Sequence, residues 1–157
     1  MNYRIREILE PEYPLLNNFL YEAIFIPEGI DPPPKTIIVS PELQVYVERF
    51  GESKDDRGLV AEVNGKIIGA VWVRIMNDYG HIDDETPSLA ISLYNEYRRF
   101  GIGTALMKEI LTQLKEHGYK RVSLSVQKAN YAVKLYQKVG FEVVKENEEE
   151  YIMVNYL

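Results

Sequence analysis

The sequence contains no cysteine among its 157 residues and only two histidines. The lack of cysteine excludes disulfides, a thiolate nucleophile and any metal site that needs a cysteine ligand. His81 and His117 have neither a second histidine nor a carboxylate at a spacing typical of metal sites, so we expect no bound metal. Any chemistry of this protein must therefore proceed without a covalent cysteine intermediate.

An excess of positive charge and a long apolar run are also missing. The chain has 18 lysine and arginine residues against 24 aspartate and glutamate residues, which gives a net charge of -6. Nucleic-acid binding normally needs a basic patch, so we expect no nucleic-acid partner and favour a cationic substrate. No stretch approaches the ~20 apolar residues of a membrane-spanning helix, and the N-terminus lacks the apolar core of a secretory signal. We therefore expect a cytoplasmic protein with no membrane partner.

The apolar residues that are present suffice for one folded domain over residues 1–157, because 46% of the chain is hydrophobic. Asn64-Gly65 between two runs rich in valine and isoleucine predicts a β-hairpin over residues 59–63 and 66–76. Trp72 in the second arm is expected in the core. The remaining patterns predict strands at residues 2–9, 88–94, 122–126, 141–144 and 151–157, and helices at residues 11–25, 41–50, 102–117 and 132–139. This order predicts an α/β fold with a central twisted sheet flanked by helices.

Glycines at positions 101 and 103 lie where a strand-like run gives way to a helix-like run. Because glycine has no Cβ, the backbone can approach a ligand closely, and the free amides at the helix start can point at phosphate oxygens. Arg98 and Arg99 precede this loop and would either pair with the same anion or serve surface solubility. The segment therefore predicts an anion site, and the natural ligand would carry a pyrophosphate.

A second motif follows further along the chain, where residues 130–141 read NYAVKLYQKVGF and predict a short helix closed by glycine. Together with Arg98-x-x-Gly101-x-Gly103, this segment resembles the two signature motifs of the GCN5-related N-acetyltransferases. The resemblance covers roughly residues 58–157. It implies a mostly antiparallel sheet whose strands splay apart beside the glycine loop, with the pantetheine of acetyl-CoA in the gap.

The resemblance also implies an activity, the direct transfer of an acetyl group from acetyl-CoA to an amine within a ternary complex. The implied cofactor-binding residues are Leu93, Arg98, Arg99, Phe100, Gly101, Ile102, Gly103, Thr104 and Asn130. Among them, the backbone amides of residues 100–104 would bind the pyrophosphate, and the amide of Leu93 would hold the acetyl carbonyl. Asn130 would bond to the cofactor, cap its own helix, or do both.

Tyr136 occupies the position that the resemblance assigns to the catalytic acid. A tyrosine with a pKa near ~10 is protonated at neutral pH and can donate a proton to the departing CoA thiolate. The alternative is a half-buried aromatic side chain on an amphipathic helix. We predict that Tyr136 is the general acid.

The general base is less defined, because an alkylamine must lose a proton before it attacks. The histone acetyltransferase branch of the family has a glutamate where this sequence has Pro87. Glu85 lies two residues upstream and would share its face if the strand extends that far, so we predict Glu85 as the base. Ordered water and three neighbouring side chains remain alternatives, namely His81, Asp83 and Asp84.

The acceptor site is expected among the first two helices, the loop between them and the segment before the central strand. An apolar slot would be lined by Tyr21, Phe25, Ile26 and residues 32–34. A cation would be attracted by Glu28, Asp31 and residues 83–85. We expect the acceptor to be a small primary amine or a peptide amino group.

Two rival functions follow from the same residues. The missing glutamate is compatible with a catalytically silent acyl-CoA-binding module. A nucleotide-binding oxidoreductase is disfavoured, because the loop has only Gly-x-Gly and falls late in the chain. We also expect a possible homodimer, since a sheet edge near the C-terminal strands could pair between subunits.

Overall fold

Asn64 and Gly65 form the tight turn that joins β2 (Arg57–Val63) to β3 (Lys66–Arg74). Both residues have positive φ angles, 51° and 80°, which a two-residue hairpin turn of the right twist requires. The predicted hairpin is therefore confirmed. The other predicted strands are also present, with small differences at their ends: β1 (Arg4–Glu7), β4 (Ser88–Leu93), β5 (Arg121–Gln127), β6 (Glu142–Glu146) and β7 (Glu150–Tyr156).

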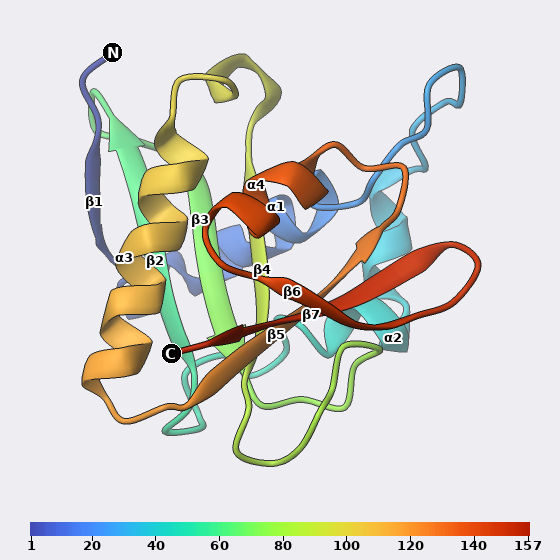
Figure 1. Ribbon diagram of the computed structural model, residues 1–157. Coiled ribbons are helices and arrows are strands. Elements are labelled where there is room, and N and C mark those ends of the chain that lie inside the picture. Colours follow the sequence, from blue (N-terminus) through green and yellow to red (C-terminus); the bar gives the residue numbers. More distant parts are fainter.

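The computed structural model, which describes residues 1–157, joins these strands into one sheet in the order β1-β2-β3-β4-β5-β7-β6 (Figure 1). Only β4 and β5 run parallel, and all other neighbours are antiparallel. The helices are α1 (Leu16–Glu22), α2 (Pro41–Gln44), α3 (Ile102–Glu116) and α4 (Ala132–Lys138). The predicted mixed, mostly antiparallel sheet flanked by helices is confirmed.

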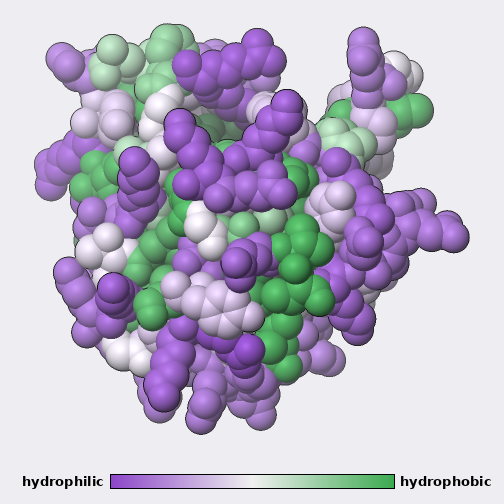
Figure 2. All heavy atoms as spheres, in the orientation of Figure 1, coloured by the Kyte–Doolittle hydropathy of each residue, from purple (hydrophilic) through white to green (hydrophobic).

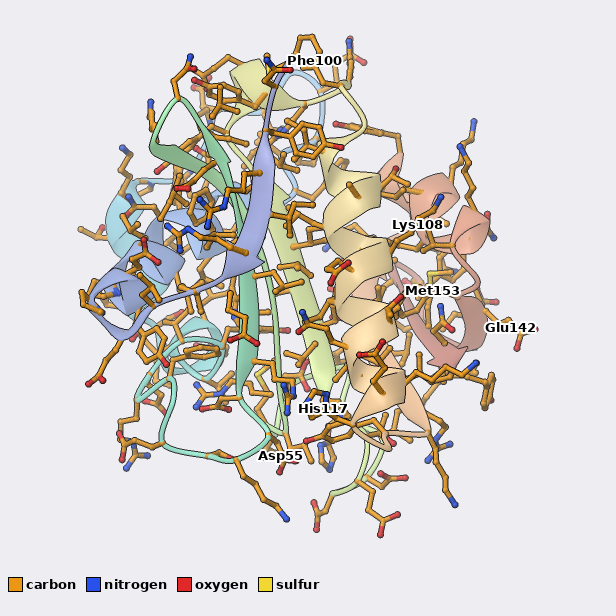
Figure 3. The ribbon with its side chains drawn as sticks, turned by 90° about the vertical axis from the view of Figure 1, so that its left-hand side faces the viewer. Asp55, Phe100, Lys108, His117, Glu142 and Met153 are labelled. Carbon is orange, nitrogen blue, oxygen red and sulfur yellow. The ribbon has the colours of Figure 1, made fainter.

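The helices form two layers, with α1 and α2 on one face of the sheet and α3 and α4 on the other (Figures 1 and 3). Side chains of β3 alternate between these layers as expected for a strand buried on both faces. Trp72 packs with Phe19 of α1, whereas Val71 and Val73 pack with the apolar side of α3. Trp72 is fully buried, and its indole N–H donates to the carbonyl of Tyr46 at 2.9 Å. The prediction that Trp72 belongs to the core is confirmed.

The first helix is shorter than predicted because Pro14 interrupts it. Proline has no N–H, and its ring clashes with the carbonyl four residues earlier, so a regular α-helix cannot run through it. Residues Glu10–Leu15 form a 3-10 helix, and α1 begins only at Leu16. The expected helix over residues 11–25 is therefore wrong over its first part and also ends early, at Glu22.

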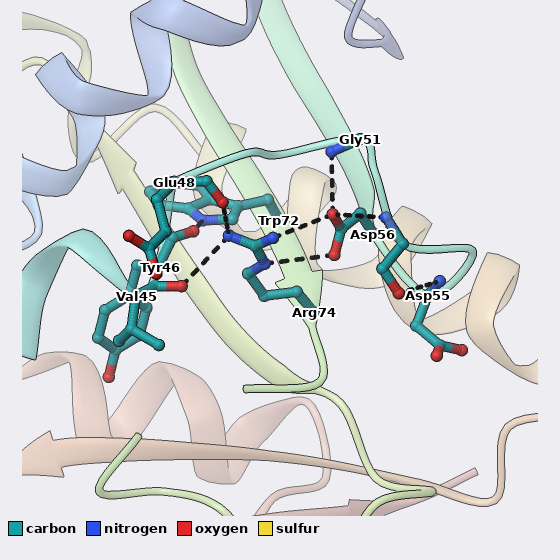
Figure 4. Close-up of polar contacts among 9 residues, drawn as sticks. Val45, Tyr46, Glu48, Gly51, Asp55, Asp56, Trp72 and Arg74 are labelled. Atoms are coloured by element: carbon teal, nitrogen blue, oxygen red, sulfur yellow. Dashed lines mark hydrogen bonds and ion pairs between the residues drawn. The ribbon is translucent and has the colours of Figure 1, made fainter. Parts of the chain in front are cut away.

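The second helix begins at Pro41 as predicted, but it ends at Gln44 instead of Phe50. In the turns that follow α2, Arg74 of β3 donates hydrogen bonds to the carbonyl of Val45 at 3.2 Å and to the carbonyl of Glu48 at 2.7 Å. The same guanidinium pairs with the carboxylate of Asp56, whose side chain is 1% exposed (Figure 4). This contact from a distant strand holds the segment in turns, which no local pattern indicates.

The strands β4 and β5 pair at one position only, Ser88 opposite Ser123, and then diverge (Figure 1). Beyond this point the edge of β4 that faces β5 has no strand partner. The divergence implied by the family resemblance is therefore present, and it opens toward the end of β4 where the glycine loop begins.

The strand β6 forms a free edge of the sheet, and all five of its residues are exposed. A bulge between Val143 and Lys145 and the charges of Glu142 and Glu146 are features that discourage edge-to-edge pairing. The homodimer stays a prediction. Among the helices, none has both the length and the apolar character needed to cross a membrane.

Candidate active-site cleft

A cleft of about 520 Å³ lies at the end of β4, between the C-terminal part of α1, the start of α3 and the helix α4. The face that carries α3 and α4 is mostly hydrophilic, with apolar atoms between the charged side chains (Figure 2). The cleft brings together eight of the predicted site residues, namely Leu93, Arg98, Arg99, Gly101, Gly103, Thr104, Asn130 and Tyr136. Four residues expected to line an acceptor slot also lie in it: Tyr21, Phe25, Ile26 and Pro32.

The glycine loop enters α3 through Gly101, whose φ of 82° is a left-handed conformation that favours glycine. The first bond of the helix joins the amide of Ala105 to the carbonyl of Gly101 at 3.1 Å. The amides of Ile102, Gly103 and Thr104 therefore have no partner within the helix, and the helix dipole adds positive potential at this end. The arrangement suits an anion.

Phe100 and Ile102 belong to the same loop but do not line the cleft. The side chain of Phe100 is 54% exposed, and that of Ile102 is buried in the core beneath α3. Their predicted contribution was through backbone amides, so the direction of their side chains leaves that prediction untouched.

Arg98 and Arg99 point in different ways although they are adjacent. Arg98 donates from Nε to the carbonyl of Leu93 at 3.0 Å and from Nη2 to the carbonyl of Glu22 at 3.3 Å. Arg99 has a φ of 70°, is exposed, and forms no ion pair. A free cation thus stands at the mouth of the cleft beside the start of α3.

Leu93 ends β4, and its polar backbone groups point into the gap left by β5. The amide of Tyr94 donates to the carbonyl of Ile68 on β3 at 3.0 Å. Because the peptide is planar and trans, the carbonyl of Leu93 points away from β3. Leu93 and Gly69 form a non-hydrogen-bonded pair, so the amide of Leu93 also points away from β3. Arg98 donates a hydrogen bond to the carbonyl of Leu93, whereas the amide of Leu93 remains available to a ligand.

Tyr136 is held on the cleft wall by the way that α4 ends. The amide of Phe141 donates to the carbonyl of Tyr136 at 2.9 Å, and the amide of Gly140 donates to the carbonyl of Gln137 at 3.1 Å. These bonds form a Schellman motif, in which Gly140 takes a φ of 108°. The rings of Tyr136 and Phe141 contact each other edge to face at 6.0 Å. The helix cap therefore explains why Gly140 and Phe141 follow Tyr136 at this spacing in the sequence.

Burial, with a smaller effect of Tyr131 nearby, raises the pKa of Tyr136 to about 12. The hydroxyl therefore stays protonated well beyond neutral pH, so it holds a proton to donate, but it is a weaker acid than a free tyrosine. Asn130 lies two residues before the start of α4, and its side-chain oxygen accepts from the amide of Ala132 at 2.9 Å, so it stabilises the turn that leads into this helix. Its amide nitrogen is left for other contacts.

Several cleft residues were missed by the sequence reasoning, including Glu22, Ile91, Tyr131 and Leu135. Tyr131 is 63% exposed and stands at the start of α4. It lies within the second motif, so its large exposed side chain next to Asn130 was a usable signal. Glu22 is the only acidic side chain on the cleft wall.

Glu85, the predicted base, is not brought to the cleft. It is exposed in the loop before β4, where its amide donates to the carboxylate of Asp83 at 2.9 Å. That bond lowers the pKa of Asp83, and Arg121 also pairs with this carboxylate. His81 contacts the carbonyl of Met76 through Nδ1 at 2.9 Å, and because a carbonyl only accepts, Nδ1 carries the proton.

Comparison with known proteins agrees with this geometry. The model of the acetyltransferase (GNAT) family matches residues 3–141. An N-alpha-acetyltransferase of Sulfurisphaera tokodaii is 34% identical over 110 residues, which cover 60% of this chain and 65% of that protein. A ribosomal protein bS18-alanine N-acetyltransferase of Haemophilus influenzae is 32% identical over 101 residues, covering 60% and 64%. The matched part is just under two thirds of each of these relatives.

A similar fold is found in the crystal structure of the PaiA N-acetyltransferase from Thermoplasma acidophilum in complex with coenzyme A. The TM-score is 0.72 at 22% identity, and the similarity covers 100% of both chains. An acetyltransferase of the GNAT family from Streptococcus pneumoniae gives a TM-score of 0.71 at 23% identity. The resemblance stated from the two sequence motifs is confirmed, and the chain belongs to the acetyltransferase (GNAT) family.

Proposed function

We propose that the protein transfers the acetyl group of acetyl-CoA to an amine, and that this amine is the α-amino group of a peptide or protein N-terminus. One observation carries the proposal: a single cleft joins the free amides at the start of α3, the free amide of Leu93 and the hydroxyl of Tyr136. These groups match the diphosphate, the thioester carbonyl and the sulfur of the donor in turn. The acetyltransferase names of the relatives support the activity, and the N-terminal names support the acceptor.

The donor would be positioned by electrostatics at one end and by the strand at the other. The amides of Ile102, Gly103 and Thr104, together with the cation of Arg99, would bind the diphosphate. The pantetheine would extend along the unpaired edge of β4, where the gap to β5 begins. Acetyl-CoA acts here as a co-substrate, and the chemistry needs no metal.

The reaction would proceed by direct attack within a ternary complex. The neutral amine adds to the thioester carbonyl, and the amide of Leu93 stabilises the resulting oxyanion. The carbon–sulfur bond then breaks, the thiolate takes the proton of Tyr136, the amine proton leaves to water, and water returns a proton to the Tyr136 phenolate. The exposed position of Glu85 favours this water path over Glu85 itself. A Glu85→Gln variant that lost turnover would reverse that preference.

The runner-up acceptor is a small primary amine, and the alternative function is a catalytically silent acyl-CoA-binding module. The position of Tyr136 in the same cleft as the free amides of α3 and the amide of Leu93 favours catalysis over passive binding of CoA. A cytoplasmic location and a homodimer remain further predictions.

The test is thiol release from acetyl-CoA with a panel of peptide N-termini, amino acids and small amines, comparing the native protein with Tyr136→Phe. Turnover with peptide N-termini that falls ~10²-fold or more in the variant is the expected result. Turnover restricted to small amines would overturn the acceptor assignment. Binding of acetyl-CoA without turnover on any amine would favour the silent module.

A further inference from the structure

The guanidinium of Arg98 forms its hydrogen bonds with other groups of the protein. Two of its three nitrogens are engaged, Nε with the carbonyl of Leu93 and Nη2 with the carbonyl of Glu22. Nη2 also lies 3.6 Å from the carboxylate of Glu22. The side chain is only 32% exposed. A phosphate bound in the cleft would have to compete with these contacts for the same nitrogens.

The bond to Leu93 fixes a peptide that the sheet secures from one side only. The peptide between Leu93 and Tyr94 is bonded to β3 through the amide of Tyr94, but its carbonyl faces the gap that β5 does not reach. Arg98 supplies the missing partner. The amide of Leu93 belongs to the preceding peptide and points into the same gap. Arg98 therefore fixes the C-terminal side of the residue that carries this amide.

The bonds to Glu22 connect this peptide to the opposite wall of the cleft. Glu22 is the last residue of α1, and its carbonyl is one that the helix leaves without an internal partner. Arg98 therefore joins the end of α1 to the end of β4 through one planar group. Lysine could reach one of these carbonyls, but it lacks the fork needed to hold both.

We propose that Arg98 is a positioning residue: it holds the end of β4 so that the amide of Leu93 meets the thioester carbonyl, and Arg99 alone supplies the side-chain charge for the diphosphate. This inference rests on the proposed acetyl transfer. It differs from the expectation from the sequence that Arg98 binds the cofactor directly. Arg98 acts through Leu93, so its removal should affect the chemical step more than donor binding.

The test compares Arg98→Lys and Arg98→Gln with the matched neighbour Arg99→Gln. Steady-state acetyl transfer gives kcat and KM for acetyl-CoA, and calorimetry gives Kd for CoA. For both Arg98 variants, kcat should fall ~10-fold or more while Kd for CoA changes less than ~3-fold. For Arg99→Gln, the larger effect should be on donor binding, with a ~10-fold rise in Kd for CoA.

Arg98→Lys keeps the charge and guards against a variant that fails to fold. One result would overturn the inference: Arg98→Lys keeps the native kcat and Kd, while Arg98→Gln raises Kd as much as Arg99→Gln does. Arg98 would then be a phosphate ligand. Turnover of the native protein tests the proposed acetyl transfer separately. Without turnover, a Kd for CoA that Arg98→Gln raises ~10-fold would still overturn the inference.

Discussion

The two glycines of the loop should respond in opposite ways to substitution by alanine, because only Gly101 has a backbone conformation that favours glycine. Gly101 has a φ of 82°, and an added Cβ would meet no atom within 4 Å. Alanine there would be strained by its backbone alone, at a cost of about 1 kcal/mol. Gly103 lies inside α3 without a positive φ, and an added Cβ would meet Leu93 Cδ1 at 3.4 Å, an ordinary contact.

The magnitudes follow from these environments. For a domain of this size, 1 kcal/mol shifts the melting temperature by about 2–4 °C, so Gly101→Ala should lower it by that amount. Gly103→Ala should raise stability by up to about 0.5 kcal/mol, because alanine restricts the unfolded chain and favours helix. If the strained loop of Gly101→Ala relaxes, one amide no longer aims at the diphosphate, and CoA should bind ~10-fold more weakly.

Thermal melting and calorimetric titration with CoA measure both quantities on the same samples. The expected pattern is a less stable, weakly binding Gly101→Ala and a Gly103→Ala that is at least as stable as the native protein and binds within ~3-fold. Equal loss of CoA affinity in both variants would refute the claim that only Gly101 needs glycine for its backbone φ angle.

Two further predictions concern the acid and the buried ion pair of Arg74 and Asp56. Because the raised pKa keeps Tyr136 protonated, kcat should show no loss from this group between pH 7 and 10, and a fall in kcat with an apparent pKa below 9 in a pH–rate profile would contradict the assignment. Arg74→Ala would leave the charge of Asp56 buried without its partner, at a cost of about 3–5 kcal/mol. Its melting temperature should fall on the order of 10 °C, and a fall under about 2 °C would show that the ion pair matters little.

Local signals predicted the elements that depend on neighbouring residues. The hairpin at Asn64 and Gly65, the start of α3 after Gly101 and the end of α4 at Gly140 each follow from a positive φ or a free helix end. The prediction of the first helix overlooked a local signal, Pro14, whereas the end of α2 has no local signal because a distant side chain contacts it. The end of α2 is set by Arg74, a partner far along the chain.

The site divides in the same way. Residues of the two motifs line the cleft because each motif is one short segment whose backbone forms the site. The inward direction of Arg98 escaped prediction, since its second partner, Glu22, lies 76 residues away. Glu85 was chosen by extending β4 upstream, but the strand begins at Ser88, and Glu85 falls in the exposed loop before it.

A crystal structure of the protein with CoA would test the central claim most directly. The account predicts diphosphate oxygens within about 2.7–3.2 Å of the amides of residues 102–104, with the CoA sulfur within hydrogen-bonding reach of the Tyr136 hydroxyl. Arg98 should keep its bond to Leu93 in that complex. A diphosphate bound away from the start of α3, or a sulfur remote from Tyr136, would contradict the assignment of this cleft as the acetyl-transfer site.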